Sequence, residues 1–208
     1  MAAGIADRSA DPSRFMDRLR APAGAVEGEQ VHGASIAVVG RGAQGIQAVA
    51  GCDALLTNAV GLALRVRTAD CLPIFFAAPL QGAVGLAHAG WRGVALALPA
   101  RVVAAFRRTY HSRPETLQVA IGPAIRVCCY EVGPEFDGRF GRFVQECGGR
   151  RMCDLIGAAI EQLRASGVRP DRIVDTRQCT ACEAQRWFSL RRQGPATGRL
   201  TSFIVVRP

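Results

Sequence analysis

Three histidines and eight cysteines are the residues of this chain best suited to metal or nucleophilic chemistry. His32 and His88 stand close to glycines, and Cys71 follows Asp70 between two apolar stretches. Imidazole and thiolate are ligands that suit zinc, and three protein ligands leave a fourth position open for water or substrate. The same residues permit a nucleophilic Cys71 that is activated by a histidine and oriented by Asp70. The spacings are too long for a local metal motif, so both hypotheses stay open at this point.

The glycine-rich turn after His88 suggests an anion site. His88 ends a predicted strand, and the turn leads into a predicted helix that begins at Val94. Backbone N–H groups at a helix N-terminus attract anions, and Arg92 in the same turn adds a guanidinium that can hold phosphate through two hydrogen bonds. The alternative is that His88 is a turn histidine packed against Trp91.

The remaining cysteines give weaker signals. Cys179 and Cys182 form a lone C-x-x-C, and no second C-x-x-C is available to complete a zinc site. The flanking charges differ from those of a thioredoxin-like motif, so we expect structural cysteines here. Cys128 and Cys129 are adjacent and either line a pocket or belong to the core. Without a visible secretory signal, reduced thiols are favoured over a disulfide framework.

The basic residues restrict the possible chemistry further. All 26 are arginine, so Schiff-base and P-loop lysine mechanisms are excluded. The net charge is +9, and residues 138–208 hold half of the arginines but about a third of the acidic residues. Aromatic residues make up only 6% of the chain, too few among the arginines for a nucleic-acid platform. We therefore expect small anionic ligands rather than nucleic acid.

No segment of the sequence indicates a membrane or a secreted protein. The longest apolar run, from Cys71 to Leu80, is too short to span a bilayer and contains Pro73 and Pro79. Residues 1–20 mix both charges and have no apolar signal core. The sequence therefore predicts a cytoplasmic protein without a membrane partner.

The alternation of apolar and glycine-rich stretches predicts one α+β domain. Residues 1–29 are expected to form an N-terminal amphipathic helix, with Phe15, Met16 and Leu19 on one face, followed by a loop. Short apolar runs predict strands at 34–39, 53–57, 62–68, 72–77, 83–87, 117–122, 172–175 and 202–206. Longer patterns predict helices at 94–110 and 154–165, with Pro99 either kinking the first helix or marking its first turn.

Taken together, these motifs make the chain resemble the YfiH-like family, whose members are described as polyphenol oxidases, laccase-domain proteins or purine nucleoside phosphorylases. The resemblance covers about residues 30–206, and its most specific elements are the Asp-Cys-Leu-Pro and His-Ala-Gly-Trp-Arg-Gly sequences. The matching segments are 30–33, 53–55 with 68–73, 88–93, 121–125, 129–133, 154–155, and 188–192 with 197–199.

The resemblance implies a fold and a metal site. The fold would be a single-domain mixed α/β/β/α sandwich, as in YfiH and the CNF toxins, with residues 30–208 as the metal-dependent catalytic domain. The metal ligands would be His32, Cys71 and His88, holding zinc, with copper as the other possibility. Cys71, His88, Asp70 and Arg92 would be catalytic, and Arg92 and Arg191 would bind substrate.

The implied activity is phosphorolysis of adenosine, inosine and methylthioadenosine, with adenosine deamination as a companion reaction. The partners would be purine nucleosides and phosphate, with the protein a monomer or a homodimer. Family members usually begin with a longer segment that contains a glycine-rich, arginine-bearing strand, and this sequence begins after it. We therefore expect either another element in its place or an incomplete pocket.

Three other activities remain alternatives. The family has been linked to copper-dependent oxidation of phenols, but three histidines cannot build a multicopper site, which leaves one copper at the same ligands. A second alternative is editing of peptidoglycan precursors. The third is a metal-free cysteine hydrolase that uses Cys71 and His88.

Overall fold

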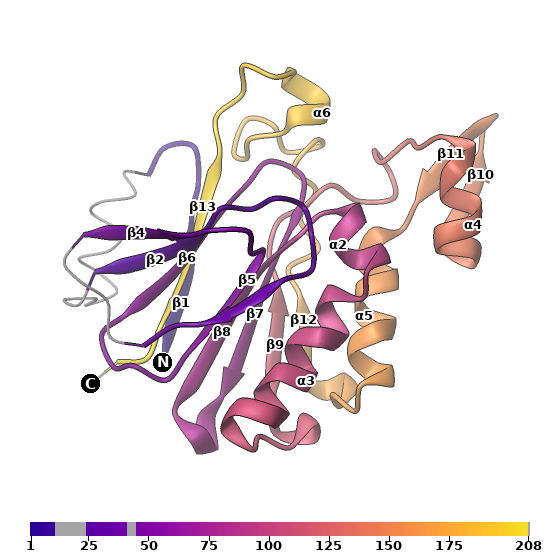
Figure 1. The fold of residues 1–208 in the computed structure, drawn as a ribbon. Coiled ribbons are helices and arrows are strands. Elements are labelled where there is room, and N and C mark those ends of the chain that lie inside the picture. Colours follow the sequence, from indigo (N-terminus) through magenta and orange to yellow (C-terminus); the bar gives the residue numbers. More distant parts are fainter. Residues whose placement is uncertain (11–23, 41–44, 208) are drawn as a thin grey trace.

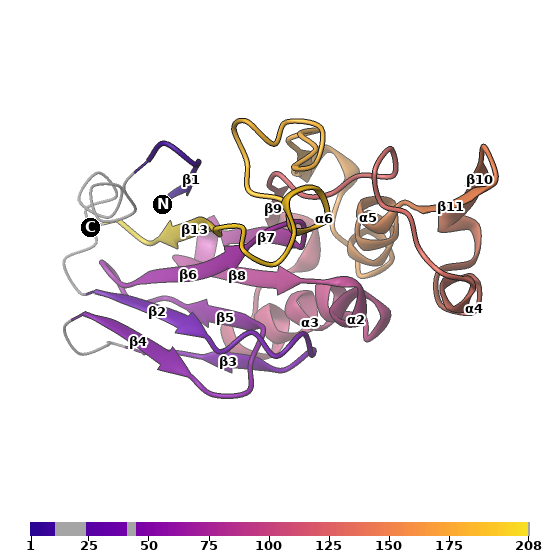
Figure 2. The same ribbon diagram turned by 90° about the horizontal axis from the view of Figure 1, so that it is seen from above.

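The computed structural model describes residues 1–10, 24–40 and 45–207, and two sheets form its centre. The first sheet has the order β1 (Ala2–Ala6), β13 (Leu200–Val205), β6 (Ala63–Thr68), β2 (Ala25–Gly28) and β4 (Ile46–Val49). The second sheet has the order β12 (Ile173–Asp175), β9 (Gln118–Ile121), β7 (Leu72–Ala78), β8 (Ala83–Ala89), β5 (Ala54–Thr57) and β3 (Ile36–Val38). Figures 1 and 2 show the two sheets side by side.

Helices cover the six-stranded sheet on the side away from the first sheet (Figure 1). These helices are α2 (Trp91–Ala95), α3 (Leu98–Tyr110) and α5 (Leu155–Ala165), whereas α4 (Asp137–Phe140) and α6 (Leu190–Gln193) lie away from this layer. Strands β10 (Val144–Cys147) and β11 (Arg150–Cys153) form a separate hairpin that lies beside α4. Single 3-10 turns lie at Pro79–Gln81, Pro114–Thr116, Pro134–Phe136, Gly141–Phe143 and Pro170–Arg172.

The alternation of side chains along the strands produces two apolar layers. In β5, Leu55 faces the core between the sheets, whereas Leu56 faces the core under the helices. β7 repeats this pattern, with Phe75 between the sheets and Phe76 toward the helices. Because strand side chains point alternately to opposite faces, a strand that is buried on both faces must be apolar throughout. The predicted mixed sandwich is confirmed in its two packed sheets and in the helices on the six-stranded side.

Helix α3 comes unusually close to β8. A Cβ added to Gly85 would lie 2.8 Å from the Phe106 ring, so only glycine leaves room for that ring. Phe106 is completely buried and also contacts the rings of Phe76 and Tyr110. This contact fixes α3 against the strand that carries His88.

The single helix predicted at 94–110 is wrong. The structure has α2 and α3, separated at Ala97, whose φ of +60° breaks the helix. Pro99 lies in the first turn of α3, where its missing N–H costs no hydrogen bond, so the first-turn alternative is confirmed. The predicted helix at 154–165 is confirmed as α5, and the Asp154 side chain caps it by accepting from Gly157 N.

The N-terminal helix and loop predicted for residues 1–29 are wrong for the part of the chain that the structure describes. Residues 2–6 form β1, which pairs with β13, and residues 25–28 form β2, which pairs with β6 and β4. Both strands are therefore part of the five-stranded sheet. The expected apolar face of Phe15, Met16 and Leu19 lies outside the described residues.

Candidate metal centre and cavity

His32, Cys71 and His88 come together at one end of the six-stranded sheet. Cys71 immediately precedes β7, and His88 lies near the end of β8. The antiparallel pairing of these strands sets Pro73 opposite His88, which brings the two ends together. His32 lies in the loop after β2. The potential ligand atoms of all three residues lie within 4.8 Å of one another.

A buried carboxylate holds both histidines. Asp53 precedes β5, and its Oδ1 lies 2.9 Å from Nδ1 of His88. The same carboxylate accepts hydrogen bonds from the backbone N–H groups of His32 (3.0 Å) and Gly33 (2.7 Å). Because Nδ1–H of His88 donates to Asp53, the other ring nitrogen of His88, Nε2, is available to Cys71. This is the arrangement by which a carboxylate fixes the tautomer of a metal-binding histidine.

The sequence reasoning assigned no role to Asp53, although the residue was part of a matching motif. The available signal was an acidic residue at the start of the apolar run 53–57. Its side chain is completely buried, and a buried carboxylate requires partners. Burial raises its pKa, but the hydrogen bonds from His88 and Gly33 lower the pKa by more than burial raises it, so Asp53 stays ionised.

The electrostatics of the site favour a thiolate. Burial raises the pKa of Cys71, but hydrogen bonds to His32 and His88 outweigh it and bring the pKa down to about 7. Burial lowers the pKa of His88, while Asp53 and Cys71 raise it to about 9. Without a metal, Cys71 and His88 therefore form a thiolate–imidazolium pair near neutral pH.

The residues around this cluster fit a zinc ion. A Cβ on Gly90 would lie 3.2 Å from both Cys71 Sγ and the His32 ring, so glycine keeps the space beside the ligands open. His32 has a φ of +60°, a conformation that costs energy and is typically kept where a side chain must be aimed. Two imidazoles, one thiolate and a carboxylate behind one imidazole form the donor set of an open zinc site.

A cavity of about 550 Å³ opens directly onto the cluster. This volume lies within the range of small-molecule sites. Its walls combine two residues of the cluster, His32 and Cys71, with aromatic, apolar and cationic side chains. The lining residues include His32, Asp70, Cys71, Trp91, Arg92, Ile125, Tyr130, Leu155, Leu190 and Arg191.

Two arginines stand on the cavity wall, each beside an aromatic ring. The Arg92 guanidinium lies 4.8 Å from the ring centroid of Trp91. The Arg191 guanidinium lies 5.3 Å from the ring centroid of Tyr130, and its Nη1 donates to the Glu131 carbonyl at 2.6 Å. Both side chains are exposed, so their remaining N–H groups are available to an anion in the cavity.

Asp70 connects the cluster to the C-terminal part of the chain. Its Oδ1 accepts from the Thr180 hydroxyl at 2.6 Å, and its Oδ2 accepts from the Arg191 backbone N–H at 2.7 Å. Asp70 has a φ of +88°, which turns the chain immediately before Cys71. Both carboxylate oxygens thus hold neighbouring chain segments.

The helix expected to begin at Val94 starts earlier, at Trp91, and this first helix has only five residues. So short a helix carries little dipole, because the dipole grows with the number of aligned peptide units. The anion site expected at its N-terminus therefore depends on the side chains of Arg92 and Arg191.

Residues 8–207 match the family described as multi-copper polyphenol oxidoreductase laccase. The chain belongs to this laccase-like family. The resemblance to YfiH-like proteins is therefore confirmed.

Members of the laccase-like family carry different names. Purine nucleoside phosphorylase YlmD of Geobacillus stearothermophilus is 40% identical over 191 residues, which are 85% of this chain and 70% of that protein. Adenosine deaminase RL5, from an unknown prokaryote, is 35% identical over 161 residues, which are 73% of this chain and 61% of that protein.

Solved structures of the laccase-like family share the fold. The crystal structure of YlmD from G. stearothermophilus superimposes with a TM-score of 0.88 and 32% identity, covering 100% of this chain and 92% of that one. The hypothetical protein YfiH of Bacillus licheniformis gives a TM-score of 0.85 and 30% identity, covering 93% and 79% of the two chains. No helix in the described part of the chain is long and apolar enough to cross a membrane.

Proposed function

We propose that this protein cleaves purine nucleosides with phosphate, with adenosine deamination as a companion activity, at a metal held by His32, Cys71 and His88. The observation that carries the proposal is the convergence of these three ligands beside a cavity that is lined by His32 and Cys71 and by Arg92 and Arg191. Relatives named purine nucleoside phosphorylase and adenosine deaminase support it. Adenosine, inosine and methylthioadenosine are the proposed substrates.

The cavity walls suit the parts of such substrates. The wall offers a purine base aromatic and apolar surface from Trp91, Tyr130, Ile125 and Leu155. Phosphate would be bound by Arg92 and Arg191, because planar guanidinium groups hold it through paired hydrogen bonds. A cavity with both features brings base and phosphate together, which lowers the entropic cost of their reaction.

A zinc ion at the three ligands would supply Lewis-acid chemistry and activation of water near neutral pH. Asp53 orients His88 by accepting a hydrogen bond from its Nδ1–H. Since both oxygens of Asp70 already accept hydrogen bonds, we assign it the positioning of Thr180 and Arg191 at the cavity. Copper at the same ligands is the other metal to be tested.

Replacement of Cys71 by alanine tests this proposal. We expect C71A to lose the metal of this site and to lose phosphate-dependent cleavage of inosine by at least about 100-fold, because an incomplete ligand set weakens both binding and Lewis-acid activation. Metal analysis and chromatography of the released base measure the two effects. The control is C147S, which removes an exposed thiol outside the cavity. Full cleavage by C71A would refute the proposal.

A metal-free cysteine hydrolase is the second candidate. The thiolate–imidazolium pair of Cys71 and His88 favours it, because the thiolate is the reactive form of cysteine. Full activity after complete removal of metal, together with alkylation of Cys71 that stops turnover, would favour this candidate. Loss of activity on metal removal and recovery on metal addition would favour the phosphorylase.

The family description also names polyphenol oxidation. A multicopper centre needs many more histidines than the three in this chain, so an oxidase could use only a single copper at the same ligands. We expect the protein to act in the cytoplasm, where its thiols stay reduced.

A further inference from the structure

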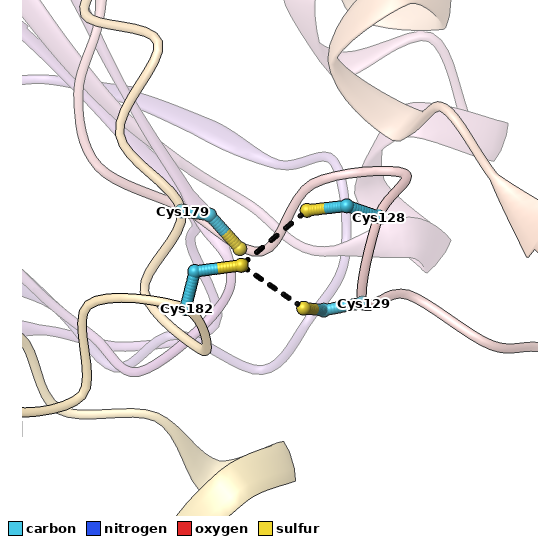
Figure 3. Close-up of side chains that lie close together, drawn as sticks. All are labelled: Cys128, Cys129, Cys179 and Cys182. Atoms are coloured by element: carbon cyan, nitrogen blue, oxygen red, sulfur yellow. Dashed lines mark hydrogen bonds between the residues drawn. The ribbon is translucent and has the colours of Figure 1, made fainter.

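Four cysteines form a second cluster, outside the cavity. Cys128 and Cys129 approach Cys179 and Cys182, and the four sulfur atoms lie within 4.8 Å of one another. Cys182 Sγ lies 3.6 Å from Cys128 Sγ and 3.3 Å from Cys129 Sγ (Figure 3). Figure 3 shows all four side chains pointing toward one another from two separate loops.

Backbone pairing between these loops sets the register of the cluster. Ala124 and Cys179 form an isolated parallel bridge, in which Thr180 N donates to the Ala124 carbonyl at 3.1 Å. The chain then turns at Arg126, whose carbonyl accepts from the backbone N–H of Cys129 at 2.9 Å. This turn directs two adjacent thiols toward the C-x-x-C.

We propose that Cys128, Cys129, Cys179 and Cys182 hold a structural zinc ion. Four thiolates are a complete tetrahedral ligand set, and C-x-x-C is the usual spacing of one half of such a site. Zinc–sulfur bonds of about 2.3 Å place tetrahedral sulfur atoms about 3.8 Å apart. The sulfur separations here already approach that value, so small side-chain rotations complete the site.

Other products of four cysteines fit this geometry less well. A disulfide requires a sulfur–sulfur distance of about 2.05 Å, and all eight cysteines are free. An iron–sulfur cluster separates the thiolates that bind different irons, whereas these four sulfur atoms converge on one point. A single tetrahedral ion therefore suits the cluster best.

The surroundings of the cluster also suit bound thiolates. Burial raises the pKa of Cys179, but this effect is outweighed by the backbone N–H groups of Cys182, Arg126 and Ala181, which point at its sulfur. The net pKa of Cys179 is therefore lowered. Burial and the neighbouring thiols raise the pKa of Cys128 to about 11 and also raise that of Cys129. Without a cation, the thiols of Cys128 and Cys129 therefore resist ionisation. Binding of a divalent ion favours their thiolate forms and releases their protons to solvent.

The metal can reach the cluster and would fix a long irregular segment. Cys128 and Cys182 are exposed, whereas Cys179 is buried. Residues 176–189 connect β12 to α6 without a helix or strand, and connections of this length usually need additional restraint. This segment carries Thr180, whose hydroxyl holds Asp70 beside Cys71. The bound ion would thus secure one wall of the cavity from outside it.

The test is to measure bound zinc in variants that separate the two clusters. In C71A, which lacks a ligand of the first site, we expect one zinc ion per chain by native mass spectrometry. The double variant C71A/C182S should bind none, whereas the matched control C71A/C147S should retain the ion, because Cys147 is exposed and lies outside the cluster. C71A/C128S provides a second disruption, and circular dichroism checks that each variant is folded.

Cobalt gives an independent readout. Addition of Co²⁺ to metal-free C71A should produce the intense visible absorption of tetrahedral cobalt with four thiolates, and C182S should remove it. The proposal is overturned if folded C71A binds no zinc when zinc is added under reducing conditions. A disulfide within the cluster, or iron with acid-labile sulfide, would also overturn it. None of these results depends on nucleoside cleavage, so the second site can fail or hold separately from the proposed activity.

Discussion

The two clusters differ in the way that the protein builds them. The three residues of the first cluster come from strand ends and a loop that a buried carboxylate, Asp53, holds in place. The four cysteines come from two loops, which are joined by the backbone bridge between Ala124 and Cys179 and by the ion pair of Arg126 with Asp175. The first cluster is therefore organised by a buried carboxylate and opens to a cavity, whereas the zinc ion proposed at the second would be bound by all four cysteines. A metal site with an open coordination position can bind water or substrate, whereas a site with four protein ligands has only a structural role.

Loss of the Asp53 charge should produce the largest difference in metal binding between the two clusters. Asp53→Asn keeps the shape of the side chain but replaces an acceptor oxygen with an NH2 group that faces the donors of His88 or Gly33. We expect the metal affinity of the first site to fall by about 10–100-fold, because carboxylates behind metal-binding histidines typically contribute that much. Competition with a coloured chelator measures the affinity, and zinc at the four cysteines should be unaffected.

The control for this variant is Asp171→Asn, which changes an exposed carboxylate paired with Arg169. Its metal content and activity should match those of the original protein. If D53N bound metal at the first site as tightly as the original protein, the organising role of Asp53 would be wrong.

The pH dependence of stability distinguishes the contributions of Cys71 and His88, whose pKa values shift in opposite directions. In the metal-free protein, His88 has a pKa raised from 6.5 to about 9, so its stabilising effect is complete below pH 6.5 and is lost as the pH rises through 9. Cys71 has a pKa lowered from 9.0 to about 7, so its effect is complete above pH 9 and is lost as the pH falls through 7. Between these values the two effects oppose each other.

We therefore expect C71A to remove the Cys71 contribution and to leave the part of the His88 shift that Asp53 causes. Relative to the original metal-free protein, the stability of C71A should decrease more steeply as the pH rises above 6.5, by at most about 1.4 kcal/mol per pH unit. Urea unfolding in the presence of chelator measures this difference. Parallel pH profiles for the two proteins would show that Cys71 and His88 do not form the pair.

The smallest effect on activity is expected from a change at Thr180, whose hydrogen bond to Asp70 connects the segment of the four cysteines to the first cluster. Thr180→Val removes the buried hydroxyl that donates to Asp70, which leaves one carboxylate oxygen without that partner. We expect a loss of about 1–2 kcal/mol in the free energy of unfolding. KM should rise severalfold while metal content stays constant, because the substitution disturbs the cavity wall and no ligand.

Thr116→Val is a matched control for this change. It removes a hydroxyl that donates to the Arg113 carbonyl in a 3-10 turn away from the cavity. A KM increase of the same size in both variants would argue against a connection from residues 176–189 to the cavity through Asp70.

The sequence predicted the centre of the fold better than its edges. The strands that became β7 and β8 have continuous apolar runs, which are typical of strands buried on both faces. β1, β2 and β4 were not predicted, because β1 is short and alanine-rich, β2 has only four residues, and β4 is largely exposed. These strands are stabilised in the sheet by pairing, β1 with β13, and β2 with both β4 and β6.

The candidate sites were predictable to different degrees. The ligand set of His32, Cys71 and His88 followed from the family resemblance, because spacing alone left metal and nucleophile hypotheses open. The C-x-x-C was interpreted as structural for lack of a second pair. The adjacent Cys128 and Cys129 are the second half of the cluster, but they lie some fifty residues before Cys182 in the sequence. The fold brings them together through the pairing of Ala124 with Cys179 and the ion pair of Arg126 with Asp175.

Analysis of the products formed from inosine tests the central claim most directly. The metal-loaded protein is incubated with inosine in the presence and absence of phosphate, and the sugar product is identified by mass spectrometry. The account predicts hypoxanthine and ribose 1-phosphate, formed only when phosphate is present, because Arg92 and Arg191 of the cavity wall are proposed to hold phosphate beside His32 and Cys71. Free ribose at the same rate with or without phosphate, or no release of base, would contradict it.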